Sequence, residues 1–356
     1  MNIPFSKGFN EMIRTKRLTV TIKDVAIRAG VSVATVSHVV NQSRFVTEET
    51  QKKVKKAVKE LNYHPNILAK NLRSKKSNVV GVVICDLENP FFLEVLRGIE
   101  TSLAEKDYDM LVTNTNYHIL KEKKAVEMLY GKQVDGVILV PGSNKGEHVD
   151  FLLDLGVPVV VLDKEIEIRK QEVDFVLIDN RKGSNEMIRH LVNLGHERIG
   201  IIAGPQDTST GKERLEGCLQ AFEELSYPIR EEYIKIGDFK KLSGEKLTLE
   251  LLSLKPPPSV IYACNNPMGL GSFEVLKKEG IDIPAEVGLV LFDDLPWFPY
   301  INPPLTTVSQ PPFVMGKIGG DLLLERLIKR RKKPKKVILE VEIKIRFSGG
   351  EKIFKR

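Results

Sequence analysis

The stretch from Thr21 to Asn41, TIKDVAIRAGVSVATVSHVVN, decides the fold of the amino-terminal part of the chain. It predicts two short helices, because apolar residues recur at helical spacing on both sides of Gly30. Thr21 and Asp24 form a capping pair at the start of the first helix. Gly30 ends that helix, since glycine readily adopts the left-handed backbone conformation, and Ser32 caps the second.

Two helices joined by a short glycine-containing turn are typical of a helix-turn-helix. Such motifs place the beginning of the second helix against base edges in the major groove of DNA. The inward-facing apolar residues of the second helix are Val36, Val39 and Val40, and the outward-facing ones are Val33, Ala34, Ser37 and His38. DNA binding is the favoured interpretation, and a small helical hairpin without DNA is the alternative.

The charge distribution supports a nucleic-acid partner. Residues 1–76 carry 16 Lys and Arg against 5 Asp and Glu, a net charge of +11, whereas the whole chain is +7. A basic segment that coincides with the helix-turn-helix indicates nucleic-acid binding rather than an ordinary solvated lysine face. A second basic run, Lys329–Lys336 (KRRKKPKK), is interpreted as a solvated connection rather than a second DNA site.

Two further segments complete the basic part of the chain. A third helix is expected to begin at its cap, Thr47, and to end near Leu61. The segment Ile67–Arg73 has helical spacing but is too short to be stable alone. It either folds only on DNA, with Leu72 inserted between base steps of the minor groove, or is an ordinary linker helix.

Composition and motifs exclude several classes of protein. Apolar content of 42% and charged content of 28% are typical of a globular chain of two or three domains. No apolar run could span a bilayer and no signal peptide is recognised, so a cytoplasmic protein without a membrane partner is expected. The cysteines Cys85, Cys218 and Cys264 are far apart, which argues against disulfides and a zinc site.

Catalytic motifs are not found in the sequence. There is no phosphate-binding GxxxxGK[ST] loop, no GxSxG elbow and no HExxH pair, and the six histidines are scattered. We therefore expect no catalytic residues, no metal, no cofactor and no enzymatic activity.

From Val79 onward, short apolar runs alternate with helical patterns, which predicts parallel sheets covered by helices. The expected strands are 79–85, 110–114, 137–140, 159–162, 175–178, 199–203, 234–236, 260–264 and 289–292. The expected helices are 91–105, 120–130, 148–155, 184–194, 213–225, 244–252 and 269–278. Two similar halves predict two doubly wound subdomains, with a ligand cleft at the carboxyl ends of their strands.

These residues resemble a known family. TIKDVAIRAGVSVATVSHVVN and RFVTEETQKKVKKAVKELNYHPNILAKNLRS are similar to the headpiece of the lactose-repressor (LacI/GalR) family of bacterial transcription regulators, closest to its purine- and ribose-repressor branch. VDGVILVP, LGHERIGIIAGP and PPLTTVSQPP continue the resemblance, which extends over about residues 19–348. It implies a small all-α helix-turn-helix headpiece followed by an α/β core that resembles periplasmic binding proteins.

The resemblance also implies partners. We expect a homodimer, or a tetramer, that binds a near-palindromic double-stranded DNA operator and represses transcription. Its core is expected to close around a small effector, a sugar or sugar-like metabolite. A periplasmic-type sugar-binding protein without a regulatory role is the alternative, and a nucleotide-dependent enzyme on a doubly wound fold is a second.

The resemblance assigns site residues by position. DNA contacts are expected from Thr21, Ser32, Val33, Ala34, Thr35, Ser37, His38, Asn41, Arg44, Tyr63, Asn66, Ala69, Lys70, Leu72 and Arg73. Effector contacts are expected from Phe91, Phe92, Asp163, Thr210, Arg214, Phe239, Asn265 and Asp293. The chain departs from the family at His38, where many relatives have arginine, and at Asn266, where an aspartate is usual. Trp297 is either at the mouth of the cleft or a packed surface anchor.

The expected domain boundaries follow from these assignments. They are an amino-terminal extension at 1–18, the DNA-binding domain at 19–64, a hinge helix and linker at 65–78, the effector-binding and dimerisation core at 79–348 and a tail at 349–356. Within the core, the first subdomain is expected at about 79–177 and 309–336, and the second at about 178–308 and 337–348. Met1 and Met12 are both candidates for the true start.

Overall fold

The computed structural model describes residues 20–41, 43–63, 76–170, 172–228 and 230–350. The chain divides into two compact units, residues 1–75 and 76–356. The predicted extension at 1–18 and the predicted helix Ile67–Arg73 lie outside the described residues. Within the described part of the chain, no helix is both long enough and apolar enough to cross a membrane.

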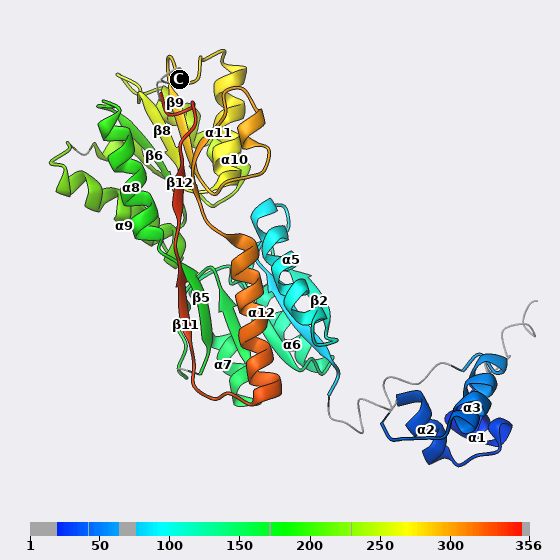
Figure 1. Ribbon diagram of the computed structural model, residues 1–356. Helices are drawn as coiled ribbons and strands as arrows, with labels where there is room; N and C mark the ends of the chain where they lie inside the picture. Colours follow the sequence, from blue (N-terminus) through cyan, green and yellow to red (C-terminus); the bar gives the residue numbers. More distant parts are fainter. Residues whose placement is uncertain (1–19, 42, 64–75, 171, 229, 351–356) are drawn as a thin grey trace, which may run out of the picture. The chain divides into compact units, whose positions relative to one another are not determined.

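The described residues of the first unit form three helices, α1 (Ile22–Ala29), α2 (Val33–Asn41) and α3 (Glu48–Glu60) (Figure 1). Asp24 accepts hydrogen bonds from the backbone N–H and the hydroxyl of Thr21, at 2.8 and 2.7 Å, as the predicted capping pair requires. Gly30 ends α1 with φ of 64°, and the backbone N–H of Val31 then donates to the carbonyl of Ala26 at 3.1 Å. This arrangement satisfies the last carbonyls of α1 and sets the turn before α2.

A small apolar core holds the three helices together. Its buried residues are Val25, Ala26, Val36, Val39, Val54, Ala57 and Tyr63. The start of α3 differs from expectation, because the Thr47 hydroxyl does not bond a backbone N–H of the helix. It lies 2.9 Å from the hydroxyl of Thr50 instead.

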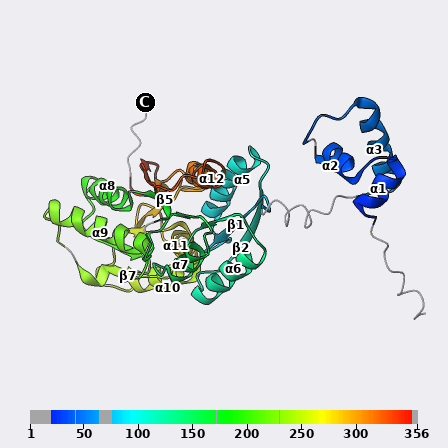
Figure 2. The same cartoon turned by 90° about the horizontal axis from the view of Figure 1, so that it is seen from below.

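The second unit has two six-stranded sheets, which confirms the predicted pair of doubly wound subdomains (Figures 1 and 2). The first sheet has the order β11-β5-β4-β3-β1-β2 and is parallel throughout. Its strands are β1 (Val79–Ile84), β2 (Asp109–Asn114), β3 (Gly136–Leu139), β4 (Val159–Leu162), β5 (Asp174–Ile178) and β11 (Lys336–Leu339).

The second sheet has the order β12-β10-β9-β8-β6-β7, in which only β12 is antiparallel to its neighbour. Its strands are β6 (Ile199–Ala203), β7 (Ile234–Ile236), β8 (Val260–Ala263), β9 (Gly288–Phe292), β10 (Thr306–Ser309) and β12 (Glu342–Lys344). The helices of the second unit are α5 (Pro90–Ala104), α6 (Ile119–Gly131), α7 (Glu147–Asp154), α8 (Asn180–Asn193), α9 (Ser209–Glu224), α10 (Lys241–Leu252), α11 (Asn266–Lys278) and α12 (Pro312–Lys329), with two 3-10 turns at Glu231–Tyr233 and Phe298–Tyr300.

The chain passes between the two halves of this unit three times. The connections are at Asp179, between β5 and α8, at residues 310–311, between β10 and α12, and at residues 340–341, between β11 and β12. Figure 1 shows the last connection as the long red segment that joins β11 to β12. The two halves are therefore joined by three segments of the chain.

The structure differs from the predicted elements in three respects. No range was predicted for α12, which has 18 residues. The strands β10, β11 and β12 were not predicted, because β10 begins with two threonines and much of β11 and β12 is exposed. The helices α8, α9, α10 and α11 each begin three or four residues earlier than predicted. Their first turns are polar and are fixed by caps such as Thr208 and Asn265, and apolar periodicity does not reveal such turns.

The closest helix contact in the first half is between α5 and α12, which lie side by side in both views (Figures 1 and 2). A Cβ atom at Gly316 would lie 1.9 Å from the carbonyl oxygen of Val95, and one at Gly98 would lie 2.1 Å from that of Phe313. Only glycine permits this approach of the two backbones.

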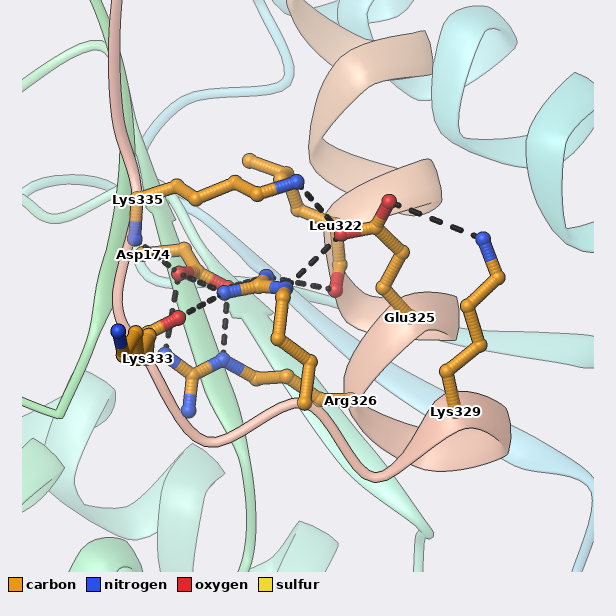
Figure 3. A network of polar contacts seen from close by, with 8 residues as sticks. Asp174, Leu322, Glu325, Arg326, Lys329, Lys333 and Lys335 are labelled. Carbon is orange, nitrogen blue, oxygen red and sulfur yellow. Dashed lines mark hydrogen bonds and ion pairs between the residues drawn. The ribbon is translucent and has the colours of Figure 1, made fainter.

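A buried ion cluster fixes the end of α12 (Figure 3). Asp174, at the start of β5, is fully buried and accepts hydrogen bonds from Arg326, from Arg331 and from the backbone N–H of Lys335. Glu325 pairs with Arg331 and Lys335 at 2.9 and 2.8 Å. Burial opposes ionisation of Asp174, but the hydrogen bonds from Arg326 and Arg331 outweigh it, so its pKa is below the ordinary value.

We predict that Asp174→Asn lowers the free energy of unfolding by about 3–5 kcal/mol, because two buried guanidinium groups lose their counter-charge. Asp154→Asn is the matched control: Asp154 is half-exposed beside Arg169 and Lys170, so solvent screens its ion pairs and its loss should cost much less than that of Asp174. A carboxyl with a lowered pKa stabilises the fold above its unfolded-state pKa, and this contribution is lost as the pH falls through the folded-state pKa. Chemical denaturation from pH 7 to pH 3 tests this, and equal losses for both variants at pH 7 would contradict it.

Candidate functional site

The first candidate surface is the exposed side of α2. Ser32, Val33 and Ala34 are exposed at its amino-terminal end, with 41% of Val33 accessible. The Ser32 hydroxyl accepts the backbone N–H of Thr35 at 3.0 Å, which fixes the start of the helix as predicted. Small side chains at this end allow the helix backbone to approach another surface closely.

Polar side chains follow on the same helix. His38 is half-buried, and its Nδ1 lies 2.9 Å from the hydroxyl of Ser43. The side-chain amide of Asn41 donates to the carbonyl of Ser37 at 2.9 Å, which closes the end of α2. Arg44 is exposed directly after it. A histidine ring oriented in this way can offer one hydrogen bond to a base edge.

The remaining predicted DNA contacts are in different environments. Thr21 is exposed at the start of α1, and Thr35 is half-buried on α2. Tyr63 is only 9% exposed and packs into the core of the first unit, apart from the exposed side of α2. The predicted contacts outside the described residues are Asn66, Ala69, Lys70, Leu72 and Arg73.

The second candidate site is a narrow pocket between the two halves of the core, with a cavity volume of about 20 Å³. All eight predicted effector residues line it, namely Phe91, Phe92, Asp163, Thr210, Arg214, Phe239, Asn265 and Asp293. Four further lining residues are Asn89, Tyr117, Lys164 and Gln310. In this conformation the lining side chains leave room for only about one water molecule, so a ligand larger than water requires the lining to move apart.

The pocket lies where the carboxyl ends of both sheets meet. In the first half, Asp163 and Lys164 follow β4 directly. In the second half, Asn265 follows β8 and Asp293 follows β9. Parallel α/β sheets present polar residues at these ends, which agrees with the cleft predicted at the carboxyl ends of the strands.

A buried ion pair forms one wall of the pocket. Lys164 is 2% exposed, and its Nζ donates to Asp163 at 2.8 Å. The Nζ lies 5.6 Å from the ring centre of Phe92 and 5.8 Å from that of Tyr117. Burial opposes the charge on Lys164, but the carboxylate of Asp163 outweighs it and raises the lysine pKa.

Arg214 forms the opposite charged wall. Its guanidinium lies over the ring of Phe292 at 3.6 Å. It donates to the side-chain oxygen of Asn180 at 2.9 Å and to the carbonyl of Cys264 at 2.7 Å. Asn180 is the first residue of α8, directly after the first connection between the halves. Arg214 therefore joins the pocket to that connection.

Asp293 is tied to another connection. Its carboxylate accepts a hydrogen bond from the side chain of Gln310, which begins the second connection. Burial raises the pKa of Asp293, and Arg214 opposes that rise. The amide side chain of Asn266 is fully buried, and neither of its polar atoms has a hydrogen-bond partner in the part of the chain that the structure describes. The family's usual carboxylate is thus replaced by a neutral, unsatisfied group.

Aromatic rings cover the other sides of the pocket. Phe91 and Phe92 meet edge to face, with centroids 5.0 Å apart, at the start of α5. Across the pocket, Phe239 lies 6.2 Å from Tyr117. Flat apolar rings beside directional polar groups suit a ligand that has both an apolar face and a rim of hydroxyl or amide groups.

Two further features mark the pocket as a functional site. The hydroxyl of Thr210 and the side-chain oxygen of Gln310 are buried without a hydrogen-bond partner among the described residues. Asp163, Phe239 and Asp293 have left-handed backbones, with φ of 70°, 67° and 76°. Such conformations are unfavourable for residues other than glycine and concentrate at binding sites.

The halves also touch directly beside the pocket. The side chain of Asn144 accepts the backbone N–H of Ser209 at 2.7 Å. The Ser209 hydroxyl accepts the backbone N–H of Glu165 at 2.9 Å. Ser209 begins α9 in the second half, whereas the other two residues belong to the first. These bonds hold the halves together on one side of the pocket.

Sequence reasoning missed several residues of the pocket. Gln310 follows β10, a strand that was not predicted, and Tyr117 lies beyond the end of β2. Lysine is usually exposed, so nothing but its position after a strand indicated that Lys164 is buried. Trp297 does not line the pocket; it is 43% exposed and lies edge-on to Phe298.

Two family models match the chain. The model for periplasmic binding proteins and the sugar-binding domain of the LacI family matches residues 77–348. The model for bacterial regulatory proteins of the lacI family matches residues 21–66. Together they cover both units of the structure.

Individual relatives agree with the family models. The HTH-type transcriptional repressor PurR of Proteus mirabilis is 38% identical over 316 residues, which are 87% of this chain and 91% of that protein. The lac repressor dimer bound to operator and the anti-inducer ONPF superposes with a TM-score of 0.80 at 28% identity, covering 93% of this chain and 99% of that one. The regulator CelR in complex with cellobiose has a TM-score of 0.71 at 31% identity, covering 92% and 99%.

A helix-turn-helix unit followed by a two-sheet core with a polar pocket defines a ligand-responsive DNA-binding regulator. The chain belongs to the LacI family of bacterial transcription regulators. Its likeness to the PurR repressors agrees with the branch that the headpiece sequence indicated.

We predict that Lys164→Met lowers the free energy of unfolding by about 3–5 kcal/mol, because Asp163 is left as an unpaired buried carboxylate. The double variant Asp163→Asn/Lys164→Met removes both charges and should recover most of that loss. Thermal unfolding of the wild type, both single variants and the double variant gives the coupling between the two sites. Additive losses would show that the ion pair does not act as a unit.

Proposed function

We propose that this protein is a cytoplasmic repressor that binds a near-palindromic operator as a homodimer and is controlled by one small effector in the core pocket. The observation that carries the proposal is the pocket itself, in which all eight predicted residues meet around unpaired polar atoms of Thr210 and Gln310. We propose no catalytic role for it.

The charges of the pocket favour a neutral polyhydroxy effector. Lys164 and Arg214 are balanced by Asp163 and Asp293, so a strongly anionic ligand would gain no net attraction. Phe91, Phe92 and Phe239 can cover the apolar face of a sugar ring, and Thr210 and Gln310 offer free hydrogen-bonding atoms. Solved relatives include complexes with cellobiose and with ribose, which agrees with a sugar.

The pocket can control DNA binding through its connections. Arg214 holds Asn180 and Asp293 holds Gln310, so a ligand that engages these groups changes the hydrogen bonds at two of the three connections. The angle between the halves would then differ between the free and bound states. A ligand shifts this equilibrium by its difference in affinity for the two states.

For DNA, we propose that Ser32, Val33, Ala34 and His38 face the major groove. Thr21, Thr35, Ser37, Asn41 and Arg44 would position the helix, and Tyr63 would support it from within the core of the first unit. The hinge residues Asn66, Ala69, Lys70, Leu72 and Arg73 are proposed to follow the family pattern in the minor groove.

Selection of bound sequences from a random duplex library should yield a near-palindromic site. Binding to that duplex should weaken linearly with the logarithm of salt concentration, with a slope of roughly −0.9 for each phosphate contacted. Val33→Ala with His38→Ala should reduce discrimination between the selected site and a mixed-sequence duplex by about 1–3 kcal/mol per lost base contact. If no sequences are enriched from the library, the proposed sequence-specific DNA binding is contradicted.

A thermal-shift screen against sugars, sugar phosphates and purines should identify the effector, because a ligand that binds only the folded state raises stability. We predict that its affinity falls as the pH is lowered, and at a higher pH than the ordinary aspartate value of 3.8, because burial raises the pKa of Asp293. Asp293→Asn should weaken binding and flatten this pH dependence, and operator binding by that variant is the control. A pH profile unchanged by Asp293→Asn would contradict the role of this carboxylate.

A further inference from the structure

The basic run Lys329–Lys336 was interpreted from the sequence as a solvated connection. In the structure it is the loop between the end of α12 and the start of β11, at the outer end of the first half of the core (Figure 1). Three of its cations, Arg330, Lys332 and Lys333, are exposed and make no ion pair among the described residues. We call these three residues the basic loop.

The buried cluster around Asp174 gives this loop a fixed shape (Figure 3). Arg331 turns inward and donates to Asp174 and to the backbone carbonyl of Lys333. Lys335 is held by its backbone N–H on Asp174 and by its side chain on Glu325. A mobile lysine tail would lose much conformational entropy on binding, whereas this loop is held in place beforehand.

The backbone turns outward at the same point. Arg330 has a left-handed backbone with φ of 54°, which ends α12 and reverses the chain. As a result, the inward-facing Arg331 lies between exposed cations on both sides. Asp174 and Glu325 are already engaged with Arg326, Arg331 and Lys335, and Glu165 is paired with Lys336. Glu172, which the strand register places opposite Lys333, offsets one of the three exposed cations, so the basic loop keeps a net positive charge.

The position of the loop indicates its partner. Val80 pairs with Gly136 at the start of the first sheet. The parallel register continues through β4, β5 and β11, so Lys333 falls in the same row as Val80. The basic loop thus lies at the edge of the sheet where the chain enters from the DNA-binding unit.

The length of the connection limits how far this edge can be from DNA. Residues 64–75 join the last described residue of the first unit to Lys76. Twelve residues span at most about 40 Å even when fully extended. This length is an upper limit on the distance between the first unit and Lys76, and it is short enough for fixed cations at this edge of the sheet to reach phosphates of the same DNA.

We propose that the basic loop is a second, sequence-independent DNA contact, in which Arg330, Lys332 and Lys333 of each subunit neutralise backbone phosphates of the bound operator. The proposal rests on the proposed DNA binding by the first unit. It adds affinity without adding base recognition, because phosphate contacts carry no sequence information directly.

The first test is the triple variant Arg330→Gln/Lys332→Gln/Lys333→Gln of the full chain, titrated with the selected operator duplex from low to high salt. One or two lost phosphate contacts per subunit should reduce the salt slope by about 2–4 for a dimer, and affinity at 0.1 M salt should fall roughly tenfold per lost contact. Affinity should fall by the same factor for the operator and for a mixed-sequence duplex, so the ratio of the two affinities should stay the same.

The matched control removes three other exposed cations, Lys121→Gln/Lys124→Gln/Lys246→Gln. It lowers the net charge equally, so it should change the salt slope little. An unchanged slope for the basic-loop variant, or an equal loss in the control, overturns the proposal. Failure of the wild type to bind the operator would contradict the proposed function. Normal binding by the wild type together with an unchanged variant would contradict only the role of the basic loop.

The second test locates the contact. Cys85, Cys218 and Cys264 are fully buried, so Lys333→Cys would carry the one readily accessible thiol among the described residues. With a DNA-cleaving iron chelate attached there, we expect cuts in the operator at two places related by its dyad. Lys246→Cys with the same reagent should give none. The absence of cuts from Lys333→Cys under conditions of full binding overturns the proposal.

Discussion

Two hydrogen-bonded pairs connect the pocket to the frame of the core, and the regulatory account depends on them. Arg214 holds Asn180 at the first connection between the halves, and Asp293 holds Gln310 at the second. The same charged groups line the pocket. A ligand therefore cannot engage them without affecting segments that set the angle between the halves. A ligand that contacts these side chains can have different affinities for two arrangements of the halves, and such a difference is the requirement for shifting a two-state equilibrium.

The buried charges explain how the pocket can be both stable and responsive. Isolated buried ions are costly, so Lys164 is paired with Asp163, and the guanidinium of Arg214 lies over Phe292. Thr210 and Gln310 nevertheless keep unpaired atoms, and Asp293 has a raised pKa. The unliganded pocket is thus left with unsatisfied polar groups that a ligand can satisfy. In the first half, at the start of β5, the Asp174 carboxylate accepts hydrogen bonds from Arg326 and from the backbone N–H of Lys335. These bonds connect α12, β5 and the segment that leads into β11.

Much of this could be predicted from the sequence, for physical reasons. The turn at Gly30 and the cap at Ser32 are local, and the alternation of apolar runs and helical patterns reports a parallel sheet directly. The resemblance placed eight residues that the structure brings into one pocket. Lys164 and Gln310 could not be found in this way, because burial of a lysine and the course of a short strand depend on tertiary packing. The inward turn of Arg331 likewise depends on Asp174, which lies 157 positions away.

The central claim is that pocket and operator are coupled, and reciprocity tests it most directly. The affinity for the operator is measured with and without saturating effector, and the affinity for the effector with and without saturating operator. Linkage requires both ratios to be equal. For the wild type, the account predicts that both ratios have the same value and that this value differs clearly from one. For Asp293→Ala, it predicts a ratio of one, with operator binding retained. A ratio of one in both directions for the wild type would contradict it.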